Sequence, residues 1–313
     1  MRRILPCLIA GTGLLVGAAE TRAQCSYAVS PALDFGTTAG LPTPQIDVAA
    51  TISVTCSSLL QVNRRVCLSI PAGTGGLSVA DRRMVAGVHD VQYQIYKDPG
   101  RTAVWGALGE SATPLAIDFP LLIGSRTEVV TVYGRVFAGQ TGKAVGSYQS
   151  DLTPIVGRWQ DFVLTGPSCQ DVTSNASTLS TLPALLTIDT SCTVVASPLD
   201  FGTVTDLTGH AASSNLSVTC TLDGPYTVAL DGGSVSGDVN DRHMLRGSGP
   251  ETIDYQLYQD SGHTQIWGDI PASVVAGVGT GGAQSIPVFG FVPAQGAKPA
   301  GPYQDVITVT VTF

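Results

Sequence analysis

Two tripeptides in the chain have the composition of a metal-binding loop. Asp34-Phe35-Gly36 and Asp200-Phe201-Gly202 spell the triplet that holds magnesium in protein kinases. A kinase also needs a glycine-rich phosphate loop, a strand with an ATP-binding lysine and an HRD catalytic loop, and the sequence has none of these. We therefore interpret both tripeptides as turns beside strands.

Other candidate catalytic groups are equally isolated. Asp189-Thr190-Ser191 is similar to an aspartic-protease loop, but the chain offers no second loop to form the carboxylate pair. Neither an HExxH motif nor another close pair of ligands occurs among the histidines, which are His89, His210, His243 and His263. The sequence therefore predicts no enzyme activity, no metal site and no cofactor.

The first 23 residues have the features of a secretory signal peptide. Arg2 and Arg3 precede an apolar stretch over residues 4–19, and Thr21-Arg22-Ala23 provides a small-residue cleavage site. Removal of this segment takes away Cys7 and leaves an even number of cysteines. In an exported protein an even number favours disulfides. Since no pair has CxxC spacing, zinc and thioredoxin-like sites are not indicated.

The composition is typical of an acidic globular protein. Of its 313 residues 13% are charged, against about 25% in an average protein, and the formal net charge is −8. This charge argues against a nucleic-acid-binding surface. The hydrophobic content of 43% is sufficient for packed cores.

The chain contains one series of motifs twice, in the same order. LDFGT occurs at Leu33–Thr37 and Leu199–Thr203, and SVTC occurs at Ser53–Cys56 and Ser217–Cys220. The other repeated motifs are DRxM at 81–84 and 241–244, YQ[IL]Y at 93–96 and 255–258, WG at 105–106 and 267–268, and YQ at 148–149 and 303–304. The preserved order predicts two homologous domains, at residues 24–158 and 191–313.

Each copy has the pattern of a β-sandwich. Apolar and polar residues alternate over Thr51–Cys56, Asn215–Cys220, Tyr226–Leu230 and Val306–Phe313, and clusters of Gly, Asp and Pro separate such runs. The sequence therefore predicts an all-β protein with two tandem sandwich domains. Core positions, or alternatively a sugar-binding platform, are expected for the repeated aromatic residues Tyr93, Trp105, Tyr255 and Trp267.

The repeats also suggest how the cysteines pair. In each copy the first cysteine precedes a strand pair and the second ends the next strand, which makes Cys25 with Cys56 and Cys192 with Cys220 the natural pairs. Cys67 and Cys169 then remain for each other. The sequence alone leaves the connectivity open.

The combined motifs resemble the Spore Coat Protein U domain, the subunit of archaic, Csu-type chaperone–usher pili. The two cysteine frames, LDFGT, DRxM, YQ[IL]YxD…WG and the final GPYQDVITVTVTF carry this resemblance over nearly the whole chain after residue 23. It implies immunoglobulin-like, pilin-type sandwiches that lack their last strand. It also implies a periplasmic chaperone, an outer-membrane usher and the exchange of donor strands between subunits.

The C-terminal domain is expected to be incomplete. It ends in the alternating run Ile307, Val309, Val311 and Phe313, after which no residues remain for another strand. A sandwich without its last strand exposes a hydrophobic groove, which a neighbour can fill with an extended segment. We expect these four residues to form the groove edge, filled first by the chaperone and then by the next pilin subunit. The alternative is a complete sandwich with an ordinary last strand.

The N-terminal end suggests the position of the protein in a fibre. After cleavage the chain would begin at Gln24, beside Cys25, with no segment to donate to another subunit. A subunit that accepts a strand but gives none is expected at the tip. The two-domain form resembles the family's tip adhesin, with domain 1 for binding and domain 2 for anchoring. Such a protein is exported through the periplasm to the cell surface, where it attaches to abiotic or host surfaces and promotes biofilm formation.

Residues 159–190 exceed a minimal linker, and we expect part of them to complete domain 1 in cis. One candidate is Gln160–Leu164, and the other has apolar residues on alternate positions, at Leu182, Ala184, Leu186 and Ile188. Pro183 makes the second candidate the less regular strand.

Two apolar insertions in domain 1 are the candidate contact surface. Domain 1 has extra residues, relative to domain 2, near Ser57–Val62 and Leu115–Ile123. Exposed loop tips are expected for Leu59, Leu60, Phe119, Leu121 and Leu122. Apolar tips lose favourable burial unless they meet a partner surface. The alternative is that these residues pack into domain 1 as extra core or strand.

Two other functions stay open from the sequence. One is a secreted, spore-coat-like structural protein that uses the same domain without polymerising. The other is a carbohydrate-binding module whose aromatic residues face a glycan. Chaperone dependence separates the coat protein from the adhesin, and competition of attachment by glycans separates the carbohydrate-binding module.

Overall fold

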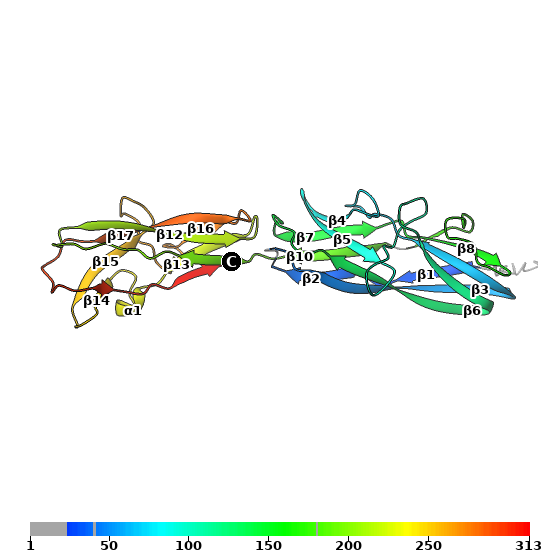
Figure 1. Cartoon of the computed structure of the whole chain (residues 1–313), viewed down its shortest axis with the longest axis horizontal. Coiled ribbons are helices and arrows are strands. Elements are labelled where there is room, and N and C mark those ends of the chain that lie inside the picture. The colour runs from blue at the N-terminus through cyan, green and yellow to red at the C-terminus, as the bar shows by residue number, and fades with distance from the viewer. Residues whose placement is uncertain (1–23, 40–41, 180) are drawn as a thin grey trace, which may run out of the picture.

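The computed structural model describes residues 24–39, 42–179 and 181–313, so the predicted signal peptide, residues 1–23, lies outside the described residues. Two β-domains lie end to end in an elongated molecule (Figure 1). Within these ranges the only helix is the four-residue α1 (Gly233–Ser236). The predicted fold class, all-β with two tandem sandwich domains, is confirmed.

Domain 1 consists of strands β1 to β10, which hydrogen-bond into one continuous sheet that curls around a single core. The order is β2-β10-β7-β4-β5-β6-β3-β8-β9, and β1 pairs with β3. β3 and β6 are the longest strands and pair from one end to the other, except for two register shifts between Ser58 and Arg64. The strands are β1 (Gln24–Val29), β2 (Leu33–Thr38), β3 (Ile46–Ser69), β4 (Arg82–Ala86), β5 (His89–Tyr96), β6 (Leu115–Val136), β7 (Gly146–Leu152), β8 (Val156–Phe162), β9 (Ser177–Thr178) and β10 (Leu182–Ile188).

Domain 2 consists of strands β11 to β19 and forms two sheets. The larger sheet has the order β11-β12-β17-β15-β14-β18, and the smaller has the order β16-β13-β19. The strands are β11 (Cys192–Ala196), β12 (His210–Cys220), β13 (Pro225–Leu230), β14 (Arg242–Arg246), β15 (Thr252–Tyr258), β16 (Val275–Val278), β17 (Ala283–Val292), β18 (Tyr303–Gln304) and β19 (Val309–Thr312).

The cores follow the alternation seen in the sequence. On β3 Ile52, Val54 and Cys56 are fully buried, and the residues between them are more exposed. β12 repeats this pattern with its buried residues Leu216 and Val218. Successive side chains of a strand point to opposite faces, so one face of each strand faces the interior.

The repeated aromatic residues belong to these cores. At most 6% of the surface is exposed for each of Tyr93, Trp105, Tyr255 and Trp267. The two indole N–H groups donate hydrogen bonds to backbone carbonyls, of Leu68 at 2.8 Å and of Val228 at 2.9 Å. These side chains therefore do not form an exposed sugar-binding platform.

Three disulfides join the six cysteines as the repeats suggested. Cys25–Cys56 links β1 to β3 and Cys192–Cys220 links β11 to β12, and the two cysteines of each pair lie opposite each other on adjacent strands. Cys67–Cys169 connects β3 to the segment that follows β8. The predicted pairings are confirmed.

The last strand of the domain 1 sheet comes from the segment before domain 2. β10 lies between β2, to which it is parallel, and β7, to which it is antiparallel. Burial is almost complete for Leu182, Ala184, Leu186 and Ile188, so β10 is part of the core. Pro183 predicted a less regular strand. In the structure the pairing of β10 with β2 begins at Ala184, one residue after Pro183. Its missing N–H therefore interrupts no bond to β2.

The first candidate for completing domain 1 lies elsewhere. Gln160, Asp161 and Phe162 form the end of β8, which pairs with β3. Val163 and Leu164 follow this strand and are exposed. The segment therefore extends the sheet beside β3 and does not fill the space between β2 and β7.

Short contacts connect the two domains. Residues 189–191 join β10 to β11. The backbone N–H of Val145 donates to the carbonyl of Leu222 at 2.9 Å, and the hydroxyl of Thr221 donates to the carbonyl of Ala39 at 3.0 Å. His89 Nε2 lies 3.4 Å from a carboxylate oxygen of Asp223. The junction is thus made of a few polar contacts around a short linker.

Candidate functional site

Among the described residues of domain 2, no strand occupies the position that β10 has in domain 1. Leu199–Thr203 repeat the sequence of β2 but form no strand, because no neighbour is present to share their backbone hydrogen bonds. Between this segment and Tyr303–Val309 lies a cavity of about 440 Å³. We call this cavity the domain 2 groove.

The walls of the domain 2 groove are apolar and incompletely buried. Three core residues of domain 1 that belong to repeated motifs are almost fully buried, namely Leu33, Phe35 and Met84. Their counterparts line the groove and are only half-buried, namely Leu199, Phe201 and Met244. Burial of apolar surface contributes about 25 cal/mol per Å². An apolar strand placed in the groove would therefore stabilise domain 2.

One polar cluster interrupts the apolar walls. The Asp305 carboxylate accepts hydrogen bonds from the hydroxyl of Tyr255 at 2.7 Å, and from the backbone N–H and hydroxyl of Ser234 at 2.9 and 2.8 Å. Its own neighbour Val306 donates a further N–H at 2.8 Å. Burial, together with the hydrogen bond to Asp305, raises the pKa of Tyr255 far above its usual value, so the phenol remains a hydrogen-bond donor.

Only two of the four residues predicted for the groove edge line the groove. Ile307 and Val309 line the groove as expected. Val311 instead packs against the core from β19, which pairs with β13 in the smaller sheet, and Phe313 is exposed beyond that strand. The chain crosses from one sheet to the other after Gln304, so the groove edge lies nearer to Tyr303. The counterparts of LDFGT and DRxM complete the groove. They were not predicted as groove residues, although their repetition in both copies was a signal that could have indicated them.

Exposed apolar side chains gather at the opposite end of the molecule. β3 and β6 extend to the end of domain 1 that is remote from domain 2, and β8 ends there too (Figure 1). Leu60 is 75% exposed and Leu164 is 92% exposed. We define the distal apolar patch as Leu59, Leu60, Leu121, Ile123, Val163 and Leu164. Leu59, Leu60 and Leu121 were predicted as exposed tips from the sequence. Ile123 ends one of the predicted insertions but was not named as a tip, and Val163 and Leu164 were assigned to a strand candidate.

Two of the predicted tip residues are buried. Phe119 and Leu122 belong to the core of domain 1 rather than to an exposed tip. The region is also not a pair of loops, because both insertions are part of the strands β3 and β6. Leu121 has a left-handed backbone with φ of 51°, which shifts the alternation so that Leu122 points inward and Leu121 outward.

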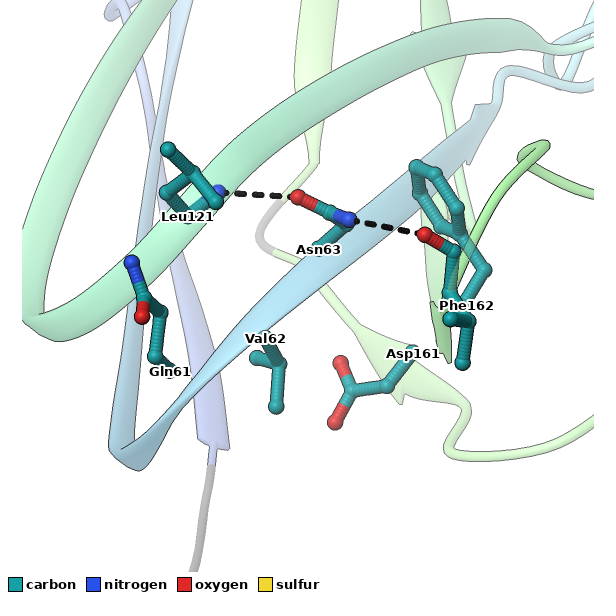
Figure 2. Close-up of a pocket in the computed structure, with 7 residues that line it drawn as sticks. Gln61, Val62, Asn63, Leu121, Asp161 and Phe162 are labelled. Atoms are coloured by element: carbon teal, nitrogen blue, oxygen red, sulfur yellow. Dashed lines mark hydrogen bonds between the residues drawn. The ribbon is translucent and has the colours of Figure 1, made fainter.

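A shallow pocket of about 350 Å³ opens beside the distal apolar patch (Figure 2). The Asn63 side chain spans it, because its oxygen accepts the N–H of Leu121 at 3.0 Å and its nitrogen donates to the carbonyl of Val163 at 3.2 Å. This side chain thereby fixes Leu121 and Val163 relative to β3. The pocket is lined by Gln61, Val62, Asn63, Leu121, Asp161, Phe162 and Val163.

A buried arginine, Arg64, fixes β8 to β3 at the end of domain 1 that carries the distal apolar patch. Arg64 is fully buried and donates two hydrogen bonds to the Asp161 carboxylate, at 2.6 and 3.0 Å. Its guanidinium also lies 3.7 Å from the centre of the Trp159 ring. Bidentate pairing and stacking on an aromatic face both restrict the side chain. These contacts of Arg64 therefore restrict the movement of β3 and β8 beside the distal apolar patch.

Comparisons with known proteins agree with the repeated motifs. The family model of the Spore Coat Protein U domain matches residues 12–154 and 178–310. The chain belongs to the Spore Coat Protein U domain family. Protein U of Myxococcus xanthus is 28% identical over 127 residues, which cover 37% of this chain and 71% of that protein. The resemblance seen in the sequence is thus confirmed.

Solved structures of tip adhesins are similar to the chain at low sequence identity. The chaperone–tip adhesion subunit pre-assembly complex CsuC–CsuE of Acinetobacter baumannii is 16% identical with a TM-score of 0.49, and the match covers 91% of this chain and 100% of that chain. The CupB6 tip adhesin of Pseudomonas aeruginosa is 13% identical with a TM-score of 0.36, and the match covers 93% of this chain and 94% of that chain.

In both Spore Coat Protein U repeats the arginine of DRxM is buried and acts as a hub. The Arg82 guanidinium donates to the carbonyls of Ile70 at 2.8 Å, Val79 at 2.9 Å and Trp105 at 2.8 Å, and to the side chain of Gln94. Burial lowers the pKa of Arg82 to about 10, which leaves it charged at neutral pH.

Arg242 repeats this arrangement in the second Spore Coat Protein U repeat. It donates to the carbonyls of Leu230 at 3.1 Å, Asp231 at 2.6 Å and Trp267 at 2.8 Å, and to the side chain of Gln256. The arginine of DRxM, the glutamine of YQ[IL]Y and the tryptophan of WG therefore form one network. This contact explains why the three motifs occur together in each copy.

Within residues 24–39, 42–179 and 181–313, no group of three or more His, Cys, Asp or Glu side chains is arranged to hold a metal ion. The same ranges contain no helix with the length and apolar character needed to span a membrane.

Proposed function

We propose that the protein is the tip adhesin subunit of an archaic chaperone–usher pilus. In this proposal it is exported through the periplasm to the cell surface with the help of a periplasmic chaperone and an outer-membrane usher. Residues 24–158 and the strand supplied by 159–190 form the adhesive domain, and residues 191–313 form the pilin domain that anchors it. Membership in the Spore Coat Protein U domain family supports this role.

The contrast between the two domains carries the proposal. β10 fills the space between β2 and β7 in domain 1, whereas the equivalent space in domain 2 is a cavity of about 440 Å³ with half-buried apolar walls. Domain 1 is therefore complete by itself, and domain 2 gains stability from a strand of another protein. The chaperone supplies that strand first, and the next pilin subunit replaces it.

The distal apolar patch is the proposed contact with a surface. It combines six exposed apolar side chains at the end of the molecule that lies away from the domain 2 groove. Large exposed apolar patches mark interaction sites, because their burial against a partner is favourable. Attachment to abiotic or host surfaces through this patch would promote biofilm formation.

Calorimetry on the chain from residue 24 to residue 313 tests the central point. The sample is heated alone and with an excess of a synthetic peptide that has the sequence of residues 181–189, which include β10. Binding at 100 times the dissociation constant stabilises a protein by about 2.7 kcal/mol, so the unfolding transition of domain 2 should move to higher temperature. A domain 2 transition that the peptide leaves unchanged would contradict an open groove.

A second readout separates the adhesin from a coat protein. Production in a bacterial periplasm with and without a pilus chaperone should show that the chain accumulates only with the chaperone. A chain that accumulates equally well alone would favour the coat-protein function.

A further inference from the structure

We propose that Asp305 determines which strand the domain 2 groove accepts, by requiring a residue no larger than alanine at the position opposite to it. This inference rests on the proposed function, in which the occupant of the groove is an extended segment of another subunit. The donor strand is then expected to place large aliphatic residues opposite Tyr303 and Ile307, with the small residue between them.

The filled sheet of domain 1 provides the template. β10 pairs with β7 so that Leu186 faces Tyr148, Ala184 faces Ser150 and Leu182 faces Leu152. All six side chains are at most 2% exposed, so they point into the core together. β10 thus presents a large, a small and a large side chain to three successive inward positions of β7.

Three observations assign Asp305 to the position of Ser150. Tyr148 and Tyr303 are repeated residues, and each hydroxyl donates at 2.8 Å to the carbonyl four residues earlier. Two positions after each tyrosine come the inward residues Ser150 and Asp305. Each of these side chains points at a glycine with positive φ, Gly73 in domain 1 and Gly233 in domain 2, where a Cβ would collide with it.

The substitution of serine by aspartate reduces the space for the incoming strand. In domain 1 the short Ser150 side chain already faces alanine. Asp305 is longer, and α1 prevents it from moving away, because Ser234 donates two hydrogen bonds to it from that helix. A leucine placed opposite Asp305 would overpack this position and weaken binding of the strand.

Although Asp305 is polar, the donor strand does not need a hydrogen-bonding residue opposite it. The Asp305 carboxylate already accepts four hydrogen bonds, from Tyr255, from Ser234 twice and from Val306. Buried polar groups need partners, and these come from the chain itself. The donor side chain opposite Asp305 is therefore selected by its size, and a small side chain fits.

Binding of labelled peptides to the chain from residue 24 to residue 313, measured by fluorescence anisotropy, tests the inference. The reference peptide has the sequence of residues 181–189 and carries Ala184 opposite Asp305. The peptide with Ala184→Leu should bind about tenfold more weakly or worse, which corresponds to 1.4 kcal/mol. The control peptide Thr187→Leu adds the same bulk on the outward face and should bind within about threefold of the reference.

Two variants of the chain complete the test. Asp305→Ser restores the side chain found in domain 1, and it should bind the reference and Ala184→Leu peptides with affinities within about threefold of each other. Asp305→Asn keeps the size and should keep the tenfold discrimination. Should Asp305→Ser fail to fold, as judged by calorimetry, the Asp305→Asn chain and the peptide series still decide.

The outcomes distinguish this inference from the proposed function. If the unchanged chain binds the reference and Ala184→Leu peptides equally, Asp305 does not select the strand, although the groove accepts one. Tighter binding of a peptide with Ala184→Lys would likewise overturn the inference, because charge rather than space would then decide. If no peptide binds at all, the proposed function itself is wrong.

Discussion

Arg82 and Arg242 show how single residues hold each domain together. The Arg82 guanidinium bonds to backbone carbonyls from three parts of domain 1, and that of Arg242 bonds to carbonyls from two parts of domain 2. We expect Arg82→Lys to lower the free energy of unfolding of domain 1 by at least about 2 kcal/mol, because one ammonium cannot reach all of these carbonyls and leaves some unpaired. Urea denaturation followed by tryptophan fluorescence measures this loss.

Arg83, the neighbour of Arg82, provides the matched control. Arg83 is partly exposed and pairs with Asp81 and Asp90 on the surface, at 3.0 and 2.6 Å. Exposed ion pairs contribute at most about 1 kcal/mol, so Arg83→Lys should change stability by less than that. Equal effects of the two substitutions would show that Arg82 is not a hub.

Asp98 and Asp260 occupy the same turn in the two repeats and should make each domain sensitive to acid. Asp98 accepts the N–H of Ala103 at 2.7 Å, and Asp260 accepts the N–H of Gln265 at 2.8 Å. These backbone N–H groups lower the pKa of both carboxyls below the usual value. The folded pKa lies below the unfolded pKa, so the stabilisation is complete above the unfolded value and is lost as the pH falls through the folded one.

Substitution of these two aspartates tests the acid effect domain by domain. Asp98→Asn should destabilise domain 1 at neutral pH and reduce the fall in its stability between neutral pH and about pH 2. Asp260→Asn should do the same for domain 2 and leave domain 1 unchanged. Urea midpoints measured across this pH range give the comparison, and parallel pH profiles for variant and original chain would reject the assignment.

Two leucines of the distal apolar patch should decide attachment. Burial of one leucine contributes roughly 1.5–3 kcal/mol, so the double variant Leu60→Ser, Leu121→Ser should reduce attachment of piliated cells to a plastic surface by about tenfold or more. The amount of pili on the cells, measured by immunoblotting, should be unchanged. Val88→Ser removes an exposed apolar side chain next to the domain junction residue His89 and serves as the control. Attachment unchanged in the double variant would reject the patch as the contact.

At the scale of elements, β10 is the strand on which domain 1 depends. Leu186 faces Tyr148 in the core, whereas Leu185 points to the other face and is half-buried. Leu186→Ala should destabilise domain 1 by about 2–5 kcal/mol through loss of burial and the cavity left behind. Leu185→Ala should cost clearly less. Chemical denaturation of both variants gives the comparison, and equal losses would contradict the role of β10 in the core.

The elements also show what a sequence can reveal and where it fails. Alternation over Leu182–Ile188 indicated a strand, but nothing in the sequence stated that this strand lies between β2 and β7, because that depends on contacts far apart in the chain. Alternation failed at Phe119–Leu122, where the left-handed Leu121 inserts a bulge and exchanges the inward and outward positions. Bulges of this kind arise from the register of β3 with β6, which a single strand does not encode.

At the scale of the whole molecule, the repeats predicted two domains but not their junction. Thr221 is fully buried there, and its hydroxyl donates to the carbonyl of Ala39 while accepting the N–H of Ser191 at 3.1 Å. SVTC predicted a strand up to Cys220, and the next residue carried no signal of its role. The groove was predicted from the alternating run over Ile307–Phe313 and from the family resemblance, but Leu199, Phe201 and Met244 were not predicted in its walls.

Thr221→Val should loosen the junction while each domain keeps its fold. Valine has the shape of threonine but neither donates to Ala39 nor accepts from Ser191, so the two domains should sample a wider range of relative orientations in small-angle X-ray scattering. Thr193→Val, at an exposed position of β11, should leave the scattering profile unchanged. Identical scattering of all three chains would show that the junction does not depend on Thr221.

The position of β10 also determines how the molecule responds to force. β10 is followed by only residues 189–191 before domain 2 begins, so traction on domain 2 along the long axis acts directly on the C-terminal end of this strand. Its hydrogen bonds to β2 and β7 lie across that direction and must rupture together rather than one after another. The segment that completes domain 1 is therefore also its mechanical connection to domain 2, and it is loaded in shear when the two domains are pulled apart.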